Sequence, residues 1–186
     1  VAGGLVGAPI RVVRAKTVDL LVPAEAEIVI EGLIDTEYLE PEAPFGESHG
    51  HVNTEEYNFI MEVTAITHRR DAVLTTIISQ VTVSESSVIK RVAMEPKFLN
   101  HLRDQLGIKG LQLVSMHEPQ TNIRRIMFLV FERGVPVTEI WRALYAASAL
   151  ESSCGKFVIA VNDDIDPDNG DAVFWALAYR SNPGLD

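Results

Sequence analysis

The sequence predicts an α+β protein with a β-rich first half followed by a layer of alternating strands and helices. Three observations lead to this prediction: β-branched and polar residues alternate before about residue 80, apolar residues follow helical spacing after Pro96, and strand and helix patterns alternate from residue 111 onward. The chain has 186 residues, 47% of them hydrophobic and 23% charged. This composition is typical of globular domains that bury a core.

In the first half, two strands are expected between residues 9 and 33, at 11–14 and 27–31, with a break at Pro23. Residues 57–67 and 72–80 are rich in Ile, Val and Thr, so we expect a hairpin around the polar turn between them. Residues 40–53 contain two prolines and two glycines and show no periodicity. A long loop is therefore expected there, and loops of this length in compact domains are often functional.

In the second half, a short helix is expected to begin at Pro96 and end at Gly107, because Phe98, Leu99, Leu102 and Leu106 follow helical spacing. The remaining pattern predicts strands at 111–116, 125–132 and 157–162 and helices at 137–150 and 169–180. We expect a boundary near Gln120, which divides the chain into a β-rich portion, 1–120, and an α/β portion, 121–186.

Charge and apolar patterning exclude several classes of function. The chain carries 26 acidic and 16 basic side chains, a formal charge of -10, so binding driven by counterion release from nucleic acid is not expected. No apolar run approaches the length needed to cross a bilayer. The single cysteine, Cys154, forms no intrachain disulfide and fits a reducing compartment, so we expect a cytoplasmic protein. Val1 replaces an initiator Met and no signal peptide follows it, which indicates a processed chain or a piece of a longer one.

The predicted loop concentrates acidic side chains around its prolines. Two carboxylates in one folded loop can perform acid–base chemistry, because their surroundings can set their pKa values apart. Glu42 and Glu47 are five residues apart, which puts them on opposite faces of a straight strand, so only a bend at Pro44 and Gly46 directs both into one pocket. An acidic, solvated surface loop is the simpler interpretation of these residues alone.

Three other features carry candidate chemistry. His49 and His51 can share one face of a strand and bind a metal, although exposed loop histidines are commoner than ligands. Residues 163–170 place acids as a calcium loop does, but Asn169 replaces the required glycine, so an N-capping turn is favoured. Lys156 is either solvated, a cap for the preceding helix, or a contact for a phosphate or carboxylate.

Six segments together carry a resemblance to a known family. They are VPA at 22–24, EIVIEG at 27–32, PEAPFGE at 41–47, KFVI at 156–159, DDID at 163–166 and WALA at 175–178. In this order they resemble the UbiD family of prenylated-FMN-dependent decarboxylases, over nearly the whole chain. The PEAPFGE core is the most specific of them.

The resemblance implies a split β-barrel related to flavin-reductase domains in 1–120 and the start of a C-terminal α/β domain, used in assembly, in 121–186. It implies reversible decarboxylation of an aromatic or α,β-unsaturated carboxylic acid, with prenylated FMN as cofactor. Glu47 corresponds to the glutamate that delivers the proton to the substrate carbon, and Glu42 to its partner in a Glu-Arg-Glu network. Lys156 then corresponds to a lysine near the flavin phosphate, and Ser48 to a position beside the flavin.

Family members are longer, and their N-terminal part supplies the network arginine and the ligands for a divalent metal, Mn or Mg, and for potassium. Arg69, Arg91 and Arg124 do not correspond to that arginine. The resemblance therefore implies that the partners are the remaining N-terminal part of the enzyme, a small carboxylic acid and further copies in a homo-oligomer. We expect no activity from this chain in isolation. The alternative is a cofactor-free binding or assembly domain that keeps only the fold.

Overall fold

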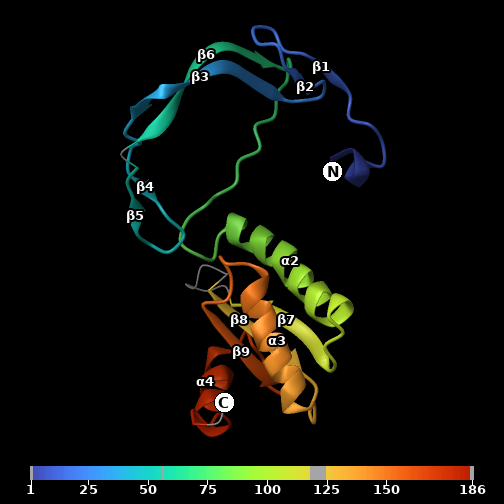
Figure 1. Ribbon diagram of the computed structural model, residues 1–186. Helices are drawn as coiled ribbons and strands as arrows, with labels where there is room; N and C mark the ends of the chain where they lie inside the picture. Colours follow the sequence, from blue (N-terminus) through green and yellow to red (C-terminus); the bar gives the residue numbers. More distant parts are fainter. Residues whose placement is uncertain (1, 56, 118–124, 185–186) are drawn as a thin grey trace. The chain divides into compact units, whose positions relative to one another are not determined.

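The computed structural model describes residues 2–55, 57–117 and 125–184 and shows a mixed α+β chain (Figure 1). The chain divides into two compact units. Unit 1 comprises Val1–Phe45 and Val52–Thr76, and unit 2 comprises Gly46–His51 and Ile77–Asp186. These units divide the chain earlier than the boundary expected near Gln120, which stays a prediction for the domains of the whole protein.

Unit 1 is built around a long antiparallel ribbon. Its strands are β3 (Ile28–Glu40) and β6 (Asn58–His68), which pair from Ile28 with His68 to Glu40 with Asn58. Its other elements are the short helix α1 (Ala2–Val6) and the antiparallel strands β1 (Val12–Arg14) and β2 (Leu21–Pro23). Within the described residues the strands form small sheets and close no barrel.

The ribbon confirms the strand expected at 57–67, but it corrects its pairing. Residues 72–80 form no strand, so the expected hairpin is wrong, and β6 pairs with β3 instead. The strand expected at 27–31 continues to Glu40 after a register shift between Glu31 and Gly32. A side chain at Gly32 would collide with the Glu62 carbonyl oxygen, so the close approach of the strands requires glycine there.

A buried carboxylate connects the ribbon to the β1–β2 turn. The Glu31 carboxylate, 4% exposed, accepts hydrogen bonds from the backbone N–H groups of Lys16 at 2.8 Å and Thr17 at 2.6 Å, and from the Thr17 hydroxyl at 2.8 Å. The two backbone donors are the main reason that the pKa of Glu31 lies below its usual value. The buried charge is therefore satisfied locally.

Unit 2 is a three-stranded sheet with helices on both faces. The strands β7 (Leu111–Met116), β8 (Ile126–Phe131) and β9 (Phe157–Asn162) lie in that order, β7 antiparallel and β9 parallel to β8. One core cluster joins the sheet to α2 (Glu85–Leu99), the π-helix η1 (Asn100–Gln105) and α3 (Val137–Leu150), and a second joins it to α4 (Gly170–Tyr179). Met127 and Leu129 of β8 lie in the first cluster and Phe128 in the second, as alternation along a strand requires.

The structure confirms the strands and helices expected after residue 110 to within a residue or two. Asn169 caps α4 by accepting from the backbone N–H groups of Asp171 and Ala172, as the N-capping interpretation predicts. The helix expected to begin at Pro96 is longer: it begins at Glu85, where Ser84 and Ser87 form a capping box, and Pro96 lies inside it. Among the described residues no helix is both long and apolar enough to cross a membrane.

Candidate functional site

Glu47 lies in a tight turn within the segment expected to be a loop. The strands β4 (Phe45–Gly46) and β5 (Val52–Asn53) pair on either side of this turn. The Glu47 N–H donates to the His51 carbonyl at 2.8 Å, and the Gly50 N–H donates to the Glu47 carbonyl at 3.0 Å. Gly50 adopts a φ of 88°, a conformation that favours glycine. The backbone thus fixes the position of Glu47, whose side chain is half-buried.

The Glu47 turn lies against Val81 and Thr82, in the segment of unit 2 that leads into α2. The Thr82 N–H donates to the Ser48 carbonyl at 3.4 Å, and a Cβ at Gly50 would lie 3.8 Å from a methyl group of Val81. Thr82 is buried, and Ser84, two residues later, is the N-cap of α2. The geometry of Glu47 and Ser48 therefore depends on how α2 begins.

Glu42 belongs to unit 1 and has different partners. Its backbone N–H donates to the Glu55 carbonyl at 2.9 Å, and its carboxylate accepts a hydrogen bond from the Asn58 side chain at 2.9 Å. The side chain is exposed. The structure thus places the two predicted glutamates in different compact units and gives each a separate set of contacts.

The two histidines beside Glu47 pack against each other. The ring centroids of His49 and His51 lie 5.2 Å apart, and the His51 N–H donates to Nδ1 of His49 at 3.3 Å. Both side chains are exposed. Across the described parts of the chain, no three histidine, cysteine or carboxylate residues are grouped so that they could hold a metal ion.

Lys156 lies immediately before β9, exposed to solvent. Gly155, with a φ of 70°, turns the chain into the strand, and the Lys156 ammonium lies 5.8 Å from the ring centroid of Phe157. Within the described residues no carboxylate forms an ion pair with it, and it makes no hydrogen bond to the end of α3. Its ammonium is therefore available to an anion, the functional alternative for this residue.

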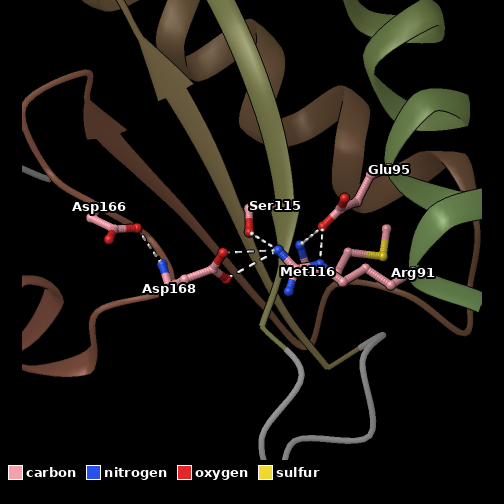
Figure 2. A network of polar contacts seen from close by, with 6 residues as sticks. All are labelled: Arg91, Glu95, Ser115, Met116, Asp166 and Asp168. Atoms are coloured by element: carbon pink, nitrogen blue, oxygen red, sulfur yellow. Dashed lines mark hydrogen bonds and ion pairs between the residues drawn. The ribbon is translucent and has the colours of Figure 1, made fainter. Parts of the chain in front are cut away.

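The two described arginines that the sequence analysis excluded as the network arginine form ion pairs with acidic side chains. Arg69 pairs with Glu27 at 3.0 Å. Figure 2 shows Arg91 of α2 between Glu95 and Asp168, at 2.7 Å and 3.0 Å. Arg124 lies outside the described residues. Neither Arg69 nor Arg91 is thus a candidate for the network arginine.

The contacts of Arg91 are a feature that the sequence analysis missed. Glu95 also accepts the backbone N–H of Met116 at 2.8 Å, so the network joins α2, β7 and the loop before α4 (Figure 2). Burial opposes the charge, but hydrogen bonds to Asp168 and Glu95 raise the pKa of Arg91 above its usual value. The spacing of Arg91 and Glu95 was the available signal, whereas Asp168 is too distant in sequence to be predicted.

Comparison with family models matches nearly the whole chain to one family. The Rift-related domain of 3-octaprenyl-4-hydroxybenzoate carboxy-lyase (UbiD) matches residues 1–81, and the C-terminal domain of the same enzyme matches residues 87–186. An uncharacterized protein of Archaeoglobus fulgidus is 25% identical over 185 residues, which are 95% of this chain and 36% of that protein.

Solved structures agree in fold. The evolved dimeric form of the UbiD-class enzyme HmfF from Pelotomaculum thermopropionicum, in complex with prFMN, is 32% identical with a TM-score of 0.79, over 100% of this chain and 42% of HmfF. Apo 3,4-dihydroxybenzoic acid decarboxylase (AroY) from Klebsiella pneumoniae is 23% identical with a TM-score of 0.79, over 99% of this chain and 39% of that enzyme, which shows the shared fold. This chain thus spans about two fifths of the length of these structures. On the strength of both domain matches, the chain belongs to the UbiD carboxy-lyase family.

Proposed function

We propose that this chain is part of a prenylated-FMN-dependent decarboxylase that acts reversibly on an aromatic or α,β-unsaturated carboxylic acid. The observation that supports this most directly is the 32% identity, across the whole chain, to HmfF in complex with prFMN. The turn that holds Glu47 half-buried supports it further, because a proton donor must be positioned before it can act.

Glu47 is the proposed proton donor. When the bond to the carboxylate breaks, carbon dioxide leaves and the electron pair stays on the substrate carbon. The carboxyl group of Glu47 then gives its proton to that carbon and becomes a carboxylate, which solvent must protonate again before the next turnover. In the reverse direction Glu47 accepts the proton. The flavin, when bound, serves as the electron sink for this step.

Lys156 and Ser48 are the proposed cofactor contacts. An exposed ammonium without a carboxylate partner among the described residues fits a phosphate group, because the anion supplies the charge that the protein does not. Ser48 follows the proton donor directly and lies half-buried in the same turn, which fits a position beside the flavin ring.

The remaining parts of the proposal require polypeptide outside this chain. Glu42 is assigned to the Glu-Arg-Glu network, with the arginine and the ligands for a divalent metal and potassium contributed by an N-terminal part of the enzyme. Residues 1–120 are assigned to a split barrel completed by that part, and residues 121–186 to a domain used in homo-oligomer assembly. Within residues 121–186, this chain contributes β8, α3, β9 and α4 to that second domain.

The test uses the full-length gene product, co-expressed with a source of prenylated flavin. We expect Glu47→Gln to abolish turnover, measured as steady-state carbon dioxide release, while the flavin absorbance is retained, because the amide cannot donate the proton that completes each cycle. Glu42→Gln should also reduce turnover strongly. Glu37→Gln, which removes an exposed acid from the same acidic region, is the matched control and should keep full activity.

Two results would count against the proposal. Normal carbon dioxide release by Glu47→Gln would contradict the assignment of the proton donor. Failure of the wild-type protein to bind any flavin would contradict the decarboxylase itself and favour the cofactor-free assembly domain.

A further inference from the structure

Two cations precede neighbouring strands at the same end of the sheet in unit 2. Arg125 immediately precedes β8 and Lys156 immediately precedes β9. The parallel register pairs Ile126 with Phe157, and the Phe157 N–H donates to the Arg125 carbonyl at 2.8 Å. Continued by one residue, this register places Arg125 and Lys156 at the same level on neighbouring strands.

Two neighbouring positive charges are unfavourable unless an anion binds between them. Like charges directly opposite each other on neighbouring strands repel, and their side chains gain nothing by being close. Both side chains are exposed, and in the described parts of the chain neither forms an ion pair or a side-chain hydrogen bond. Two neighbouring positive charges therefore have no carboxylate partner among the described residues.

Among the residues that the structure describes in unit 2, every arginine except Arg125 pairs with an acidic side chain. The chain carries 26 acidic side chains, and other arginines of unit 2 contact them: Arg133 and Arg180 both bind Asp164 at 2.7 Å, and Arg91 binds Glu95 and Asp168. In a strongly acidic chain, two neighbouring cations with no acidic partner in the described part concentrate the attraction for anions at that place.

Arginine and lysine side chains bind a phosphate group in different ways. A guanidinium presents a planar set of donors that matches two oxygens of a phosphate, whereas an ammonium is a compact point charge on a flexible stem. We propose that Arg125 is a further cofactor-binding residue, which binds the phosphate dianion of the flavin together with Lys156. This inference rests on the proposed function, which assigns only Lys156 to that phosphate.

The experiment compares FMN with riboflavin, which lacks the phosphate, on the full-length gene product by quenching of flavin fluorescence. We expect Arg125→Gln and Lys156→Gln each to weaken FMN binding about tenfold, the size typical of a charge-assisted hydrogen bond. Riboflavin binding should not change. Arg125→Lys, which keeps the charge and loses the planar donor set, should give an intermediate loss.

Lys90→Gln is the matched control, because it removes an exposed cation of the same unit and changes the net charge equally. If Arg125→Gln binds FMN as tightly as Lys90→Gln does, while Lys156→Gln is weakened, the inference is wrong and the proposed function stands. An equal loss of riboflavin binding in Arg125→Gln would also overturn it, since the effect would not concern the phosphate.

A wild-type protein that binds no flavin would contradict the proposed function separately. In that case the cation pair is tested by measuring the thermal unfolding midpoint with and without inorganic pyrophosphate. Stabilisation of the wild type that is lost in Arg125→Gln and kept in Lys90→Gln supports an anion site at this end of the sheet, and no stabilisation of the wild type overturns it.

Discussion

At the scale of single residues, Glu31 shows how one carboxylate organises a segment distant in sequence. Its carboxylate accepts hydrogen bonds from the backbone N–H groups of Lys16 and Thr17, and these bonds hold the β1–β2 turn in place. The position of Glu31 itself is fixed by the pairing of β3 with β6. Such a group stabilises the fold only while it is charged, because an uncharged carboxyl group accepts hydrogen bonds from N–H groups more weakly.

We therefore expect Glu31→Gln to lower the thermal unfolding midpoint of the full-length protein at pH 7. The pKa of Glu31 is depressed in the folded state, so its contribution is complete above the unfolded-state value, about 4.3, and is lost as the pH falls through the folded value. The difference between variant and wild type should thus shrink in acid. Glu62→Gln, an exposed acid of the same ribbon, should change the midpoint little, and an equal effect of both substitutions would contradict the assigned role.

Gly110 is a second residue with a definite structural requirement. Its φ is 72°, and a Cβ there would collide with a methyl group of Val135. Gly107 has a similar φ of 66° with open space around it. We expect Gly107→Ala to lower the free energy of unfolding by about 1 kcal/mol, from backbone strain alone. Gly110→Ala should cost roughly 2 kcal/mol or more, because overpacking is added to that strain. Urea denaturation measures both free energies of unfolding. Equal losses in the two variants would show that the Val135 side chain moves aside without cost.

At the scale of elements, much of unit 2 was predictable and unit 1 was less so. The strands and helices after residue 110 follow clear hydrophobic periods, and the buried side chains of β8 and α3 agree with those periods. Residues 72–80 have the composition of a strand, but strand formation needs a pairing partner, and β6 pairs with β3 rather than with this segment. Composition reports propensity and says nothing about which partner is available.

The same distinction explains the error at α2. Pro96 suits a first turn, yet the helix begins earlier because Ser84 and Ser87 satisfy its first N–H groups. The candidate site shows a comparable limit: the resemblance identified Glu47 and Lys156, whereas the contacts of Glu47 with the backbone around His51 and of Arg125 with β9 depend on pairing across the fold.

Ser84 gives a prediction about how α2 and the Glu47 turn are connected. Ser84→Ala removes the N-cap, so we expect a loss of about 1 kcal/mol in the free energy of unfolding. The Thr82 N–H reaches the Ser48 carbonyl just before this cap, so turnover should fall as well. Ser148→Ala, which removes an exposed hydroxyl that donates within α3, is the control and should leave turnover unchanged. Equal turnover in both variants would show that the start of α2 does not position the turn.

At the scale of the whole molecule, the two units differ in how well they bury their apolar side chains. Unit 2 encloses side chains such as Phe98, Leu129 and Phe131, which are at most 1% exposed. In unit 1 the cross-strand pairs Ile30 with Ile66 and Ile34 with Met61 are all apolar, yet these side chains are 39% to 60% exposed. A two-stranded ribbon with an uncovered apolar face is marginally stable in water.

The proposed function supplies what covers this face: the part of the enzyme that lies outside this chain. We therefore expect amide hydrogens of β3 and β6 to exchange rapidly in the 186-residue chain and slowly in the full-length protein, because exchange reports local opening. Amides of β7, β8 and β9 should be protected in both and serve as the internal control.

Ile30→Asp tests directly whether this face is covered, because a charge destabilises the ribbon only where the face is buried. The substitution should increase exchange in β3 and β6 of the full-length protein and change little in the isolated chain, whose ribbon is already exposed to water. Glu62→Asp, at an exposed acidic position of the ribbon, should change neither. Strong protection of β3 and β6 in the isolated chain would show that unit 1 is stable without further polypeptide, and the split-barrel assignment would then have to be abandoned.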